Sequence, residues 1–554
     1  MKFFTRFLCL ILSLLTLLSV ASCAGGKRPN ESTPTDGTQA PTETAAPPPA
    51  EPTPVQLTAD VKLQTVYLYA GESYALPHTL SAREDHAAVL NPVWTATHDC
   101  VTVKDGVVTA VKEGYAIVSA GGTNDCLVRV LPNALPVLSI DTDGAKIDSK
   151  ETYTVCSIDV ESESGDFDME AVSGGIRLRG NSTSRRPKVP YRIRFDEKRN
   201  LLGLNAGAKC RSWVLIAEYQ DDSYTRTAVS LSLASVILGE YSSDWCFVDL
   251  YINGRHIGVY TLCEQSQIND HRINIEEAGE DSPELQSGYL FEFDGANPNT
   301  GKPTVFYDDY DITVFPTNEE YEFATNDAGT YGKLFYELKN DGVSAEQIAF
   351  AHNYFQSILD LIYYATYEDV FFKINEKTGI RTPSNALSAE EAIRAAVDIE
   401  SAARMYILSE IICNSDEYKK SFYFYVDFSE NGTGKLTFAC PWDFDGTIVK
   451  WATYEFKPYN EYFASQQNLF YVMLMNNEFF RETVREIWCE LYEETNGFEN
   501  VIHAVSRISE VYAEELAVEK ELWDRKNDQA KLCETTCRWL RVRINWLNQQ
   551  FLNF

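Results

Sequence analysis

Positive charge is scarce in this chain. Its 554 residues include 48 Lys and Arg against 81 Asp and Glu, which gives a formal net charge of -33 at pH 7. A surface this acidic repels the phosphates of nucleic acids and the anionic face of a membrane. We therefore expect neither nucleic acid nor a membrane bound through surface charge among its partners.

Long apolar runs are also scarce. One short run, Phe7 to Val20, follows Lys2 and Arg6 and ends in small residues. A positive start, a short apolar core and small residues before a cleavage point are typical of a secretory signal peptide, here residues 1–22. No later run approaches the roughly 18 apolar residues that a membrane span needs.

The cysteine after these small residues, in Val20-Ala21-Ser22-Cys23, resembles a bacterial lipobox. The resemblance implies that Cys23 carries lipid and that this anchor alone holds the protein to a membrane, on its extracytoplasmic side. An ordinary signal peptide with an incidental Cys is the alternative. Residues 23–58 are rich in Pro and Thr and poor in large apolar residues, so we expect a disordered tether.

Zinc-binding patterns are missing as well. Cys533 and Cys537 have helical spacing and no partner Cys or His pair, so we expect no zinc site there. Of the 13 Cys, removing Cys9 and Cys23 leaves 13 − 2 = 11. Outside the cytoplasm an odd number leaves at least one thiol unpaired within the chain.

Short β-type runs with turn signals fill residues 59–132, which predicts a small all-β sandwich. The stretch VWTATHDCVTVKDGVVTAVKEGYAIVSA resembles the bacterial Ig-like group 2 domain. That family implies a surface spacer or adhesion module, so we assign no chemistry here. Cys100 and Cys126 could pair within it, and their spacing does not decide the question.

The rest of the chain, residues 133–554, changes character in the middle. Its first half alternates like strands and contains one helical pattern, 223–238, and a strong hairpin turn at Asn253-Gly254. Its second half is mostly helical, with patterns at 344–364, 389–412, 478–492, 502–522 and 528–550. We expect an α+β domain with a strand-rich lobe and a helical lobe, as in a protein kinase.

An acidic stretch from Asn414 to Gly446 reads as helix end, strand, turn, strand and acidic turn. A tight hairpin returns its far end to its start, so Asp416, Asp443 and Asp445 are expected to converge. Close carboxylates repel one another unless a cation or proton lies between them. We predict a metal site here; capping of a turn and a helix end is the alternative for each Asp alone.

A basic stretch surrounds a small polar turn. Asn181, Ser182 and Thr183 offer backbone N–H groups to an anion, and the basic side chains, among them Lys188, Arg192 and Arg194, favour phosphate. A solvated hairpin with exposed Arg is the alternative. A concentrated basic patch in a chain this acidic favours an anion site.

Arg226 lies in the first turn of the helix predicted over 223–238, where a cation opposes the helix dipole. It either addresses a bound anion together with the helix start or forms a salt bridge to Asp221 or Asp222. Glu218 and Glu264, at strand ends, are weaker candidates for pairing with the basic turn.

Several blocks in order resemble the CotH kinases, a family named for a spore coat protein. They cover nearly everything after the Ig-like segment and read RLRGNSTSRRPKVPYRIRF, LLGLNAGAKCRSWVLIAEYQDDSYTRTAVSLSLA, FVDLYINGRHIGVYTLCEQ, VDIESAARMYILSEIICNSDEYKKSFYFY and PWDFDG.

The resemblance implies an atypical two-lobed kinase that binds ATP with Mg²⁺ or Mn²⁺ and phosphorylates protein side chains. By motif, Asp416 holds the catalytic-loop position, and Asp443, with Asp445 beside it, the metal-binding position. The turn at 180–183 covers the phosphates, and the strand end at 260–265, which includes Glu264, approaches the adenine. Phosphoryl transfer needs these acidic and basic groups.

Three departures from the family pattern leave a weak or inactive kinase open: Arg194 in place of Lys, Ser184 in place of Trp, and Thr447 after the acidic turn. The rival function is a kinase-shaped surface scaffold or adhesion protein. A glycoside hydrolase with paired carboxylates is a third possibility, which the basic turn and the lack of an aromatic-flanked Glu pair oppose. The expected partner is a protein substrate or surface protein.

Overall fold

The computed structural model describes residues 65–76, 79–81, 88–90, 92–120, 125–239, 241–264, 266–279, 282–295, 303–307, 309–321, 332–450, 455–493 and 497–554. Every described residue belongs to one compact unit, which lies within residues 55–554. The predicted signal peptide, tether and lipidated Cys23, and Gln265 at the predicted strand end, lie outside the described residues.

Two small sheets form the N-terminal part. One has the order β1 (Val66–Tyr69), β9 (Asp125–Leu131), β8 (Gly114–Ala120), β5 (Trp94–Ala96), and the other β2 (Ser73–Ala75), β7 (Val107–Ala110), β6 (Val101–Lys104). A further pair joins β3 (Thr79–Ser81) to β4 (Ala88–Leu90). Alternate residues of β8 are buried, as expected of a strand with one face on a core. Cys100 and Cys126 are both buried.

A closed barrel follows, which the sequence predicted only as separate strands. Its order is β10 (Val137–Asp141), β11 (Thr154–Glu161), β12 (Met169–Leu178), β13 (Tyr191–Arg199), β14 (Cys210–Ile216), β16 (Arg255–Glu264), β15 (Trp245–Ile252). Strand β10 closes the ring by pairing in parallel with β15. The predicted turn is confirmed, because Asn253 and Gly254 both have positive φ, 51° and 72°.

Helix α1 (Arg226–Ile237) leaves the barrel after β14 and is almost wholly buried. The Asp221 carboxylate accepts hydrogen bonds from the backbone N–H groups of Thr225 (3.0 Å) and Arg226 (2.9 Å). Thr225 is the N-cap residue, and the Asp221 carboxylate satisfies backbone N–H groups at the start of the helix.

A second sheet lies in the C-terminal half, with the order β18 (Thr304–Phe306), β21 (Lys333–Leu338), β17 (Gly288–Phe293), β24 (Tyr423–Asp427), β25 (Thr437–Ala439). Helix α4 (Ile399–Ile412) precedes β24, and a short 3-10 turn, Phe444–Gly446, follows β25. The predicted succession of helix, strand, turn, strand and acidic turn is confirmed. Two short hairpins complete the strands: β19 (Thr313–Val314) with β20 (Glu319–Glu320), and β22 (Phe372–Ile374) with β23 (Arg381–Pro383).

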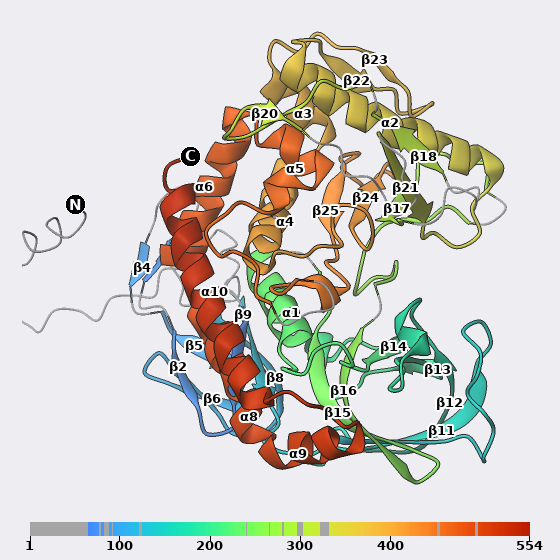
Figure 1. The fold of residues 1–554 in the computed structure, drawn as a ribbon, viewed down its shortest axis with the longest axis vertical. Helices are drawn as coiled ribbons and strands as arrows, with labels where there is room; N and C mark the ends of the chain where they lie inside the picture. Colours follow the sequence, from blue (N-terminus) through green and yellow to red (C-terminus); the bar gives the residue numbers. More distant parts are fainter. Residues whose placement is uncertain are drawn as a thin grey trace, which may run out of the picture. The chain divides into compact units, whose positions relative to one another are not determined.

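Helices make up most of the remainder (Figure 1): α2 (Ala345–Tyr367), α3 (Ala389–Ala396), α5 (Leu469–Leu474), α6 (Glu478–Glu493), α7 (Gly497–Ser506), α8 (Ile508–Val511), α9 (Ala513–Leu522) and α10 (Gln529–Phe551). Two predicted helices prove to be interrupted. The pattern over 389–412 breaks at Val397, because the Asp398 side chain caps α4 by accepting from the Ser401 N–H (3.1 Å).

The second interrupted pattern, 502–522, is divided among α7, α8 and α9. It breaks at Arg507 and again at Tyr512, whose buried hydroxyl donates to the Pro132 carbonyl at 2.7 Å. In the part of the chain that the structure describes, no helix combines the length and apolar character needed to cross a membrane.

The N-terminal sheets and the helical half share a core. Tyr67, Tyr69 and Leu131 belong to the same apolar cluster as the C-terminal helices. The Asn500 side chain on α7 accepts from the Tyr67 N–H and donates to the Tyr67 carbonyl, each at 2.9 Å. The expected boundary at residue 132 is therefore not a gap in the packing, and the Ig-like assignment stays a prediction.

Candidate active site

A cavity of about 750 Å³ opens between the barrel, α1 and the second sheet. Its lining includes residues 177–183 at the end of β12, 216–220 at the end of β14, and 442–445 after β25. The polar turn and the acidic turn, which are distant in sequence, thus face one cavity. The family resemblance implied this juxtaposition, because it placed the turn at 180–183 over the phosphates and Asp443 at the metal.

The acidic corner of the cavity is formed by Asp443 and Asp445. Asp443 has a positive φ of 61° and accepts a hydrogen bond from the Ser421 hydroxyl at 3.2 Å. Asp445 accepts from the Gln220 amide at 2.9 Å. Burial, followed by the charge of Asp443, raises the pKa of the Asp445 carboxyl to about 6.

Asp416 lies behind this corner and does not line the cavity. Its carboxylate is 5% exposed and forms an ion pair with Lys420 (3.1 Å), which does line the cavity. Burial and then the charge of Asp443 raise the pKa of Asp416. Asn414 joins the two segments, because it accepts from the Asp416 N–H (3.1 Å) and donates to the Asp443 carbonyl (3.1 Å).

The three predicted aspartates do not form one ligand cluster. Within the described ranges, no group of three or more His, Cys, Asp or Glu is placed to hold a metal ion. Mg²⁺ is commonly held by one or two carboxylates together with substrate phosphates. Asp443 and Asp445 fit that smaller donor set, because their mutual repulsion is what a divalent cation relieves.

Arginines occupy another wall of the cavity. Arg177 on β12 pairs in register with Arg192 on β13, and Arg179 stacks over the Trp442 ring at 5.4 Å. Among the described residues none of the three has a carboxylate within ion-pair distance. Burial is the largest cause that lowers the pKa of Arg192, and the neighbouring cations Arg177 and Arg179 lower it further. Such a cluster of cations is suited to a polyanionic ligand.

Asn181, Ser182 and Thr183 line the cavity at the predicted turn. Gly180 begins it with a φ of 84°, and a Cβ there would come within 2.0 Å of the Thr183 hydroxyl. Arg194 lies two residues beyond Arg192, is exposed, and does not join the cavity.

Two predicted residues prove to be engaged elsewhere. Lys188 lies at the cavity wall but is 0% exposed, and its ammonium donates to Glu519 (2.8 Å) and to the Val259 carbonyl. Burial lowers its pKa to about 8. Glu264 pairs with Arg272 (3.2 Å) away from the cavity, so the expectation that it pairs with the basic turn is wrong.

Arg226 satisfies the salt-bridge alternative. Its guanidinium pairs with Asp221 at 3.2 Å and also donates to the carbonyls of Gln220 and Asp445. It is 4% exposed and does not line the cavity. Arg226 therefore fixes the backbone of the acidic turn.

Sequence reasoning missed Lys457. Its buried ammonium donates to the carbonyls of Cys413 and Gly446 and to the Ser415 hydroxyl (2.7 Å). It thus ties the segment before Asp416 to the acidic turn. No motif singles it out, because two of its three partners are backbone carbonyls.

Glu218, a weaker candidate in the sequence, lines the cavity although it is only 3% exposed. It accepts from the Thr261 hydroxyl at 2.7 Å. Burial, then the charge of Asp221, raises the pKa of Glu218 to about 7.

The fold is mixed α+β, with strand-rich N-terminal sheets and a helical C-terminal region, and it is consistent with a kinase fold. Residues 176–547 match the CotH kinase protein family, and the chain belongs to that family. No curated protein matches the chain.

Proposed function

We propose that this protein is an atypical kinase that transfers the γ-phosphoryl group of ATP to a serine or threonine hydroxyl of a protein. The observation that carries the proposal is the opposed charge within one cavity. Arg177, Arg179 and Arg192, which form no ion pair with any described carboxylate, line one wall, and the pair Asp443 and Asp445 lines another. Family membership supports ATP as the phosphoryl donor.

Arg177, Arg179 and Arg192 would bind the triphosphate, together with backbone N–H groups of the turn at 181–183. A guanidinium offers several N–H donors in a rigid plane, which suits phosphate oxygens. A volume of about 750 Å³ is in the range of small-molecule sites.

Asp443 and Asp445 would hold Mg²⁺ or Mn²⁺. When bound, the cation neutralises phosphate charge that the protein would otherwise face alone. The raised pKa of Asp445 indicates a carboxylate that gains from a nearby positive charge. Two contacts hold Asp445 in place: the Gln220 amide donates to its carboxylate, and the Arg226 guanidinium donates to its backbone carbonyl.

Asp416 would orient the acceptor hydroxyl and take its proton. The hydroxyl oxygen forms a bond to the γ-phosphorus, the bond to the bridging oxygen breaks, and ADP leaves. The raised pKa of Asp416 makes its carboxylate a stronger proton acceptor than an ordinary aspartate. Its ion pair with Lys420 must open for this role, since Asp416 does not line the cavity.

The test measures ATP binding and phosphoryl transfer by residues 55–554. ATP with Mg²⁺ should raise the melting temperature, and labelled phosphate should move from ATP to a protein acceptor. Asp443→Asn, which keeps the shape of the side chain, should abolish both effects. Asp270→Ala, at an exposed aspartate outside the cavity, is the matched control and should behave as the original protein.

A kinase-shaped scaffold is the second candidate function. It is favoured by the engagement of Lys188 with Glu519 and by the position of Asp416 outside the cavity. A protein that no nucleotide stabilises, with or without Mg²⁺ or Mn²⁺, would be this scaffold.

We also propose that the chain is anchored outside the cytoplasm through lipid on Cys23, with its partners among surface proteins. The lipobox resemblance at residues 20–23 supports this proposal. Metabolic labelling with a fatty acid should mark the full-length protein, and Cys23→Ser should remove the label and release the protein from membranes. Labelling that survives Cys23→Ser contradicts the proposal.

A further inference from the structure

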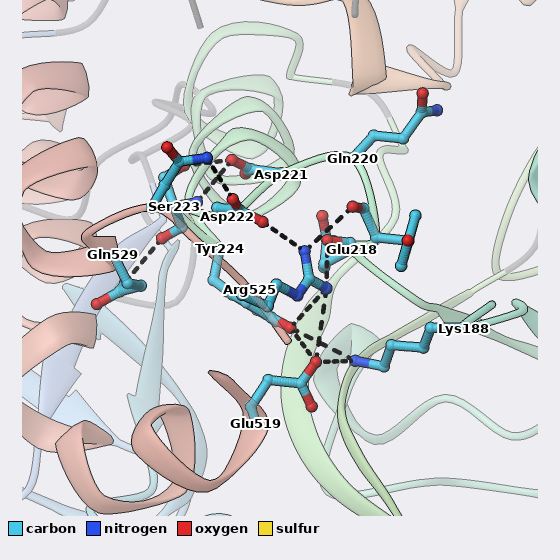
Figure 2. Close-up of polar contacts among 12 residues, drawn as sticks. Lys188, Glu218, Gln220, Asp221, Asp222, Ser223, Tyr224, Glu519, Arg525 and Gln529 are labelled. Carbon is cyan, nitrogen blue, oxygen red and sulfur yellow. Dashed lines mark hydrogen bonds and ion pairs between the residues drawn. The ribbon is translucent and has the colours of Figure 1, made fainter. Parts of the chain in front are cut away.

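The segment that follows α9 closes over the loop that joins β14 to α1 (Figure 2). The Arg525 guanidinium donates to the carbonyls of Glu218 (3.0 Å) and Tyr219 (3.1 Å). It also donates to the Asp222 carboxylate (2.7 Å) and the Tyr224 hydroxyl (3.0 Å). One buried side chain from the C-terminal region thus contacts four residues of this loop.

Neighbouring residues strengthen the same contact. Asn527 donates to the Asp222 carboxylate at 2.6 Å, and Gln529 donates to the Ser223 carbonyl at 2.8 Å. Together with Arg525 they bind the loop from its middle to the start of α1. These contacts join residues about 300 positions apart in the chain.

Glu519 on α9 belongs to the same network and contacts the barrel. Its carboxylate accepts from Lys188 (2.8 Å), from the Tyr224 hydroxyl (2.5 Å) and from the Val259 N–H (2.9 Å). It is 1% exposed and lies 3.5 Å from Arg525. A buried carboxylate with this many donors, two of them cationic, compensates the charge that Arg525 and Lys188 bring into the interior.

The loop held in this way carries two cavity residues. Glu218 and Gln220 both line the cavity, and Gln220 donates to Asp445 at 2.9 Å. In Figure 2 the Gln220 side chain extends away from Arg525. Arg525 does not line the cavity itself, so it contacts the backbone beneath Glu218 while Gln220 reaches the acidic turn.

We propose that Arg525 is a positioning residue of the active site: it fixes the Glu218–Gln220 backbone and, through Gln220, the Asp445 carboxylate. The inference rests on the kinase function proposed above. Segment 519–529 would then be part of the catalytic machinery, although it supplies no group to the cavity.

Guanidinium geometry explains why this position needs arginine. Two carbonyls, one carboxylate and one hydroxyl are reached at once by a planar group with five donors. A lysine ammonium brings three donors from a single point and cannot span these acceptors. Arg525→Lys therefore keeps the positive charge but loses the planar arrangement of N–H donors.

The experiment compares Arg525→Lys with Arg541→Lys in residues 55–554. Arg541 lies on α10, pairs with Glu499 at 2.6 Å on the surface, and is remote from the loop, so it is the matched control. Hydrogen exchange of the amides at 221–226, KM for ATP, and kcat are measured, with the melting temperature as a check on folding.

Arg525→Lys should speed exchange at 221–226 at least tenfold and lower kcat/KM for ATP with Mg²⁺ at least tenfold, at a melting temperature that keeps the protein folded. Arg541→Lys should change neither. Unchanged exchange at 221–226 in a folded Arg525→Lys protein would overturn the proposal, whatever the activity. A loss of activity that is fully explained by a smaller fraction of folded protein would also overturn it.

A failure of the proposed function gives a different result. If the unaltered protein neither binds nor turns over ATP, the kinase assignment fails and with it the catalytic part of this proposal. The exchange measurement still decides whether Arg525 orders the loop, because it needs no ligand. Arg525→Met, which also removes the charge, should speed exchange at 221–226 more than Arg525→Lys does and should lower kcat/KM for ATP further.

Discussion

The Asn414 side chain bridges the two acidic segments of the cavity: it donates to the Asp443 carbonyl at 3.1 Å and accepts from the Asp416 N–H at 3.1 Å. It is 2% exposed, so water does not compete for these bonds. One buried amide thus connects the backbone of Asp416 to that of Asp443, and the phosphoryl transfer proposed above depends on the separation of these two residues.

Asn414→Ala is expected to lower kcat at least tenfold and to cost about 1–3 kcal/mol of unfolding free energy, since it leaves a buried carbonyl and N–H without partners. Asn500→Ala is the matched control, because Asn500 is also a buried amide that bridges backbone groups, far from the cavity. Steady-state kinetics with urea denaturation would check this. Equal activity per folded molecule in the two variants would contradict it.

Lys457→Met is expected to destabilise the protein by about 1–3 kcal/mol, because the buried Cys413 carbonyl loses its donor. The Gly446 carbonyl and the Ser415 hydroxyl each lose one contact, while Ser415 still donates to Gly446. Activity should fall further than the folded fraction does, since the Cys413–Ser415 segment is held less firmly beside the acidic turn. Urea denaturation and phosphoryl transfer measure the two effects. Lys377→Met, at an exposed lysine outside the cavity, is the control and should alter neither.

Arg192→Ala is expected to weaken binding of ATP with Mg²⁺ by 10- to 100-fold, about 1.5–3 kcal/mol, the range for a hydrogen bond to a charged group. Arg194→Ala, on the same strand but exposed and outside the cavity, should leave the affinity within about twofold. Isothermal titration calorimetry distinguishes the two. Equal losses would mean that the arginines attract ATP only through general charge.

Asn500→Ala is expected to lower the unfolding free energy by about 2–4 kcal/mol, because the N–H and carbonyl of Tyr67 lose their partners in a buried contact. The N-terminal sheets and the helices should still unfold together, since they share one core. Differential scanning calorimetry checks this. A separate low-temperature transition for residues 65–131 would show that the two parts are independent.

Stability should depend on pH through Glu417, whose pKa burial raises to about 8 from 4.5. Between these values the unfolded chain releases the proton and the folded protein keeps it, so the unfolding free energy falls as pH rises, by at most about 1.4 kcal/mol per pH unit. Glu417→Gln should remove the contribution of Glu417 to this slope, while Glu218 and Asp445 keep theirs, and should be more stable than the original protein near pH 8. Denaturation between pH 5.5 and 8.5 tests it; parallel curves would contradict it.

The sequence by itself determined the local elements. The hairpin at Asn253-Gly254, the strands β12 to β16 and the order of elements around the acidic turn follow from side-chain period and turn residues, which are local properties. Local pattern also indicated that a polar basic turn and an acidic turn mattered, and the cavity brings the two together.

Only the tertiary structure decided which charges remain free. Lys188 and Arg192 look alike in the sequence, yet Lys188 is bound by Glu519, 331 residues away, while Arg192 faces the cavity. Closure of the barrel by β10 and the return of α9 to its wall set these partners. Ion pairs depend on distance in space, and no periodicity along the chain records which distant carboxylate arrives beside a given cation.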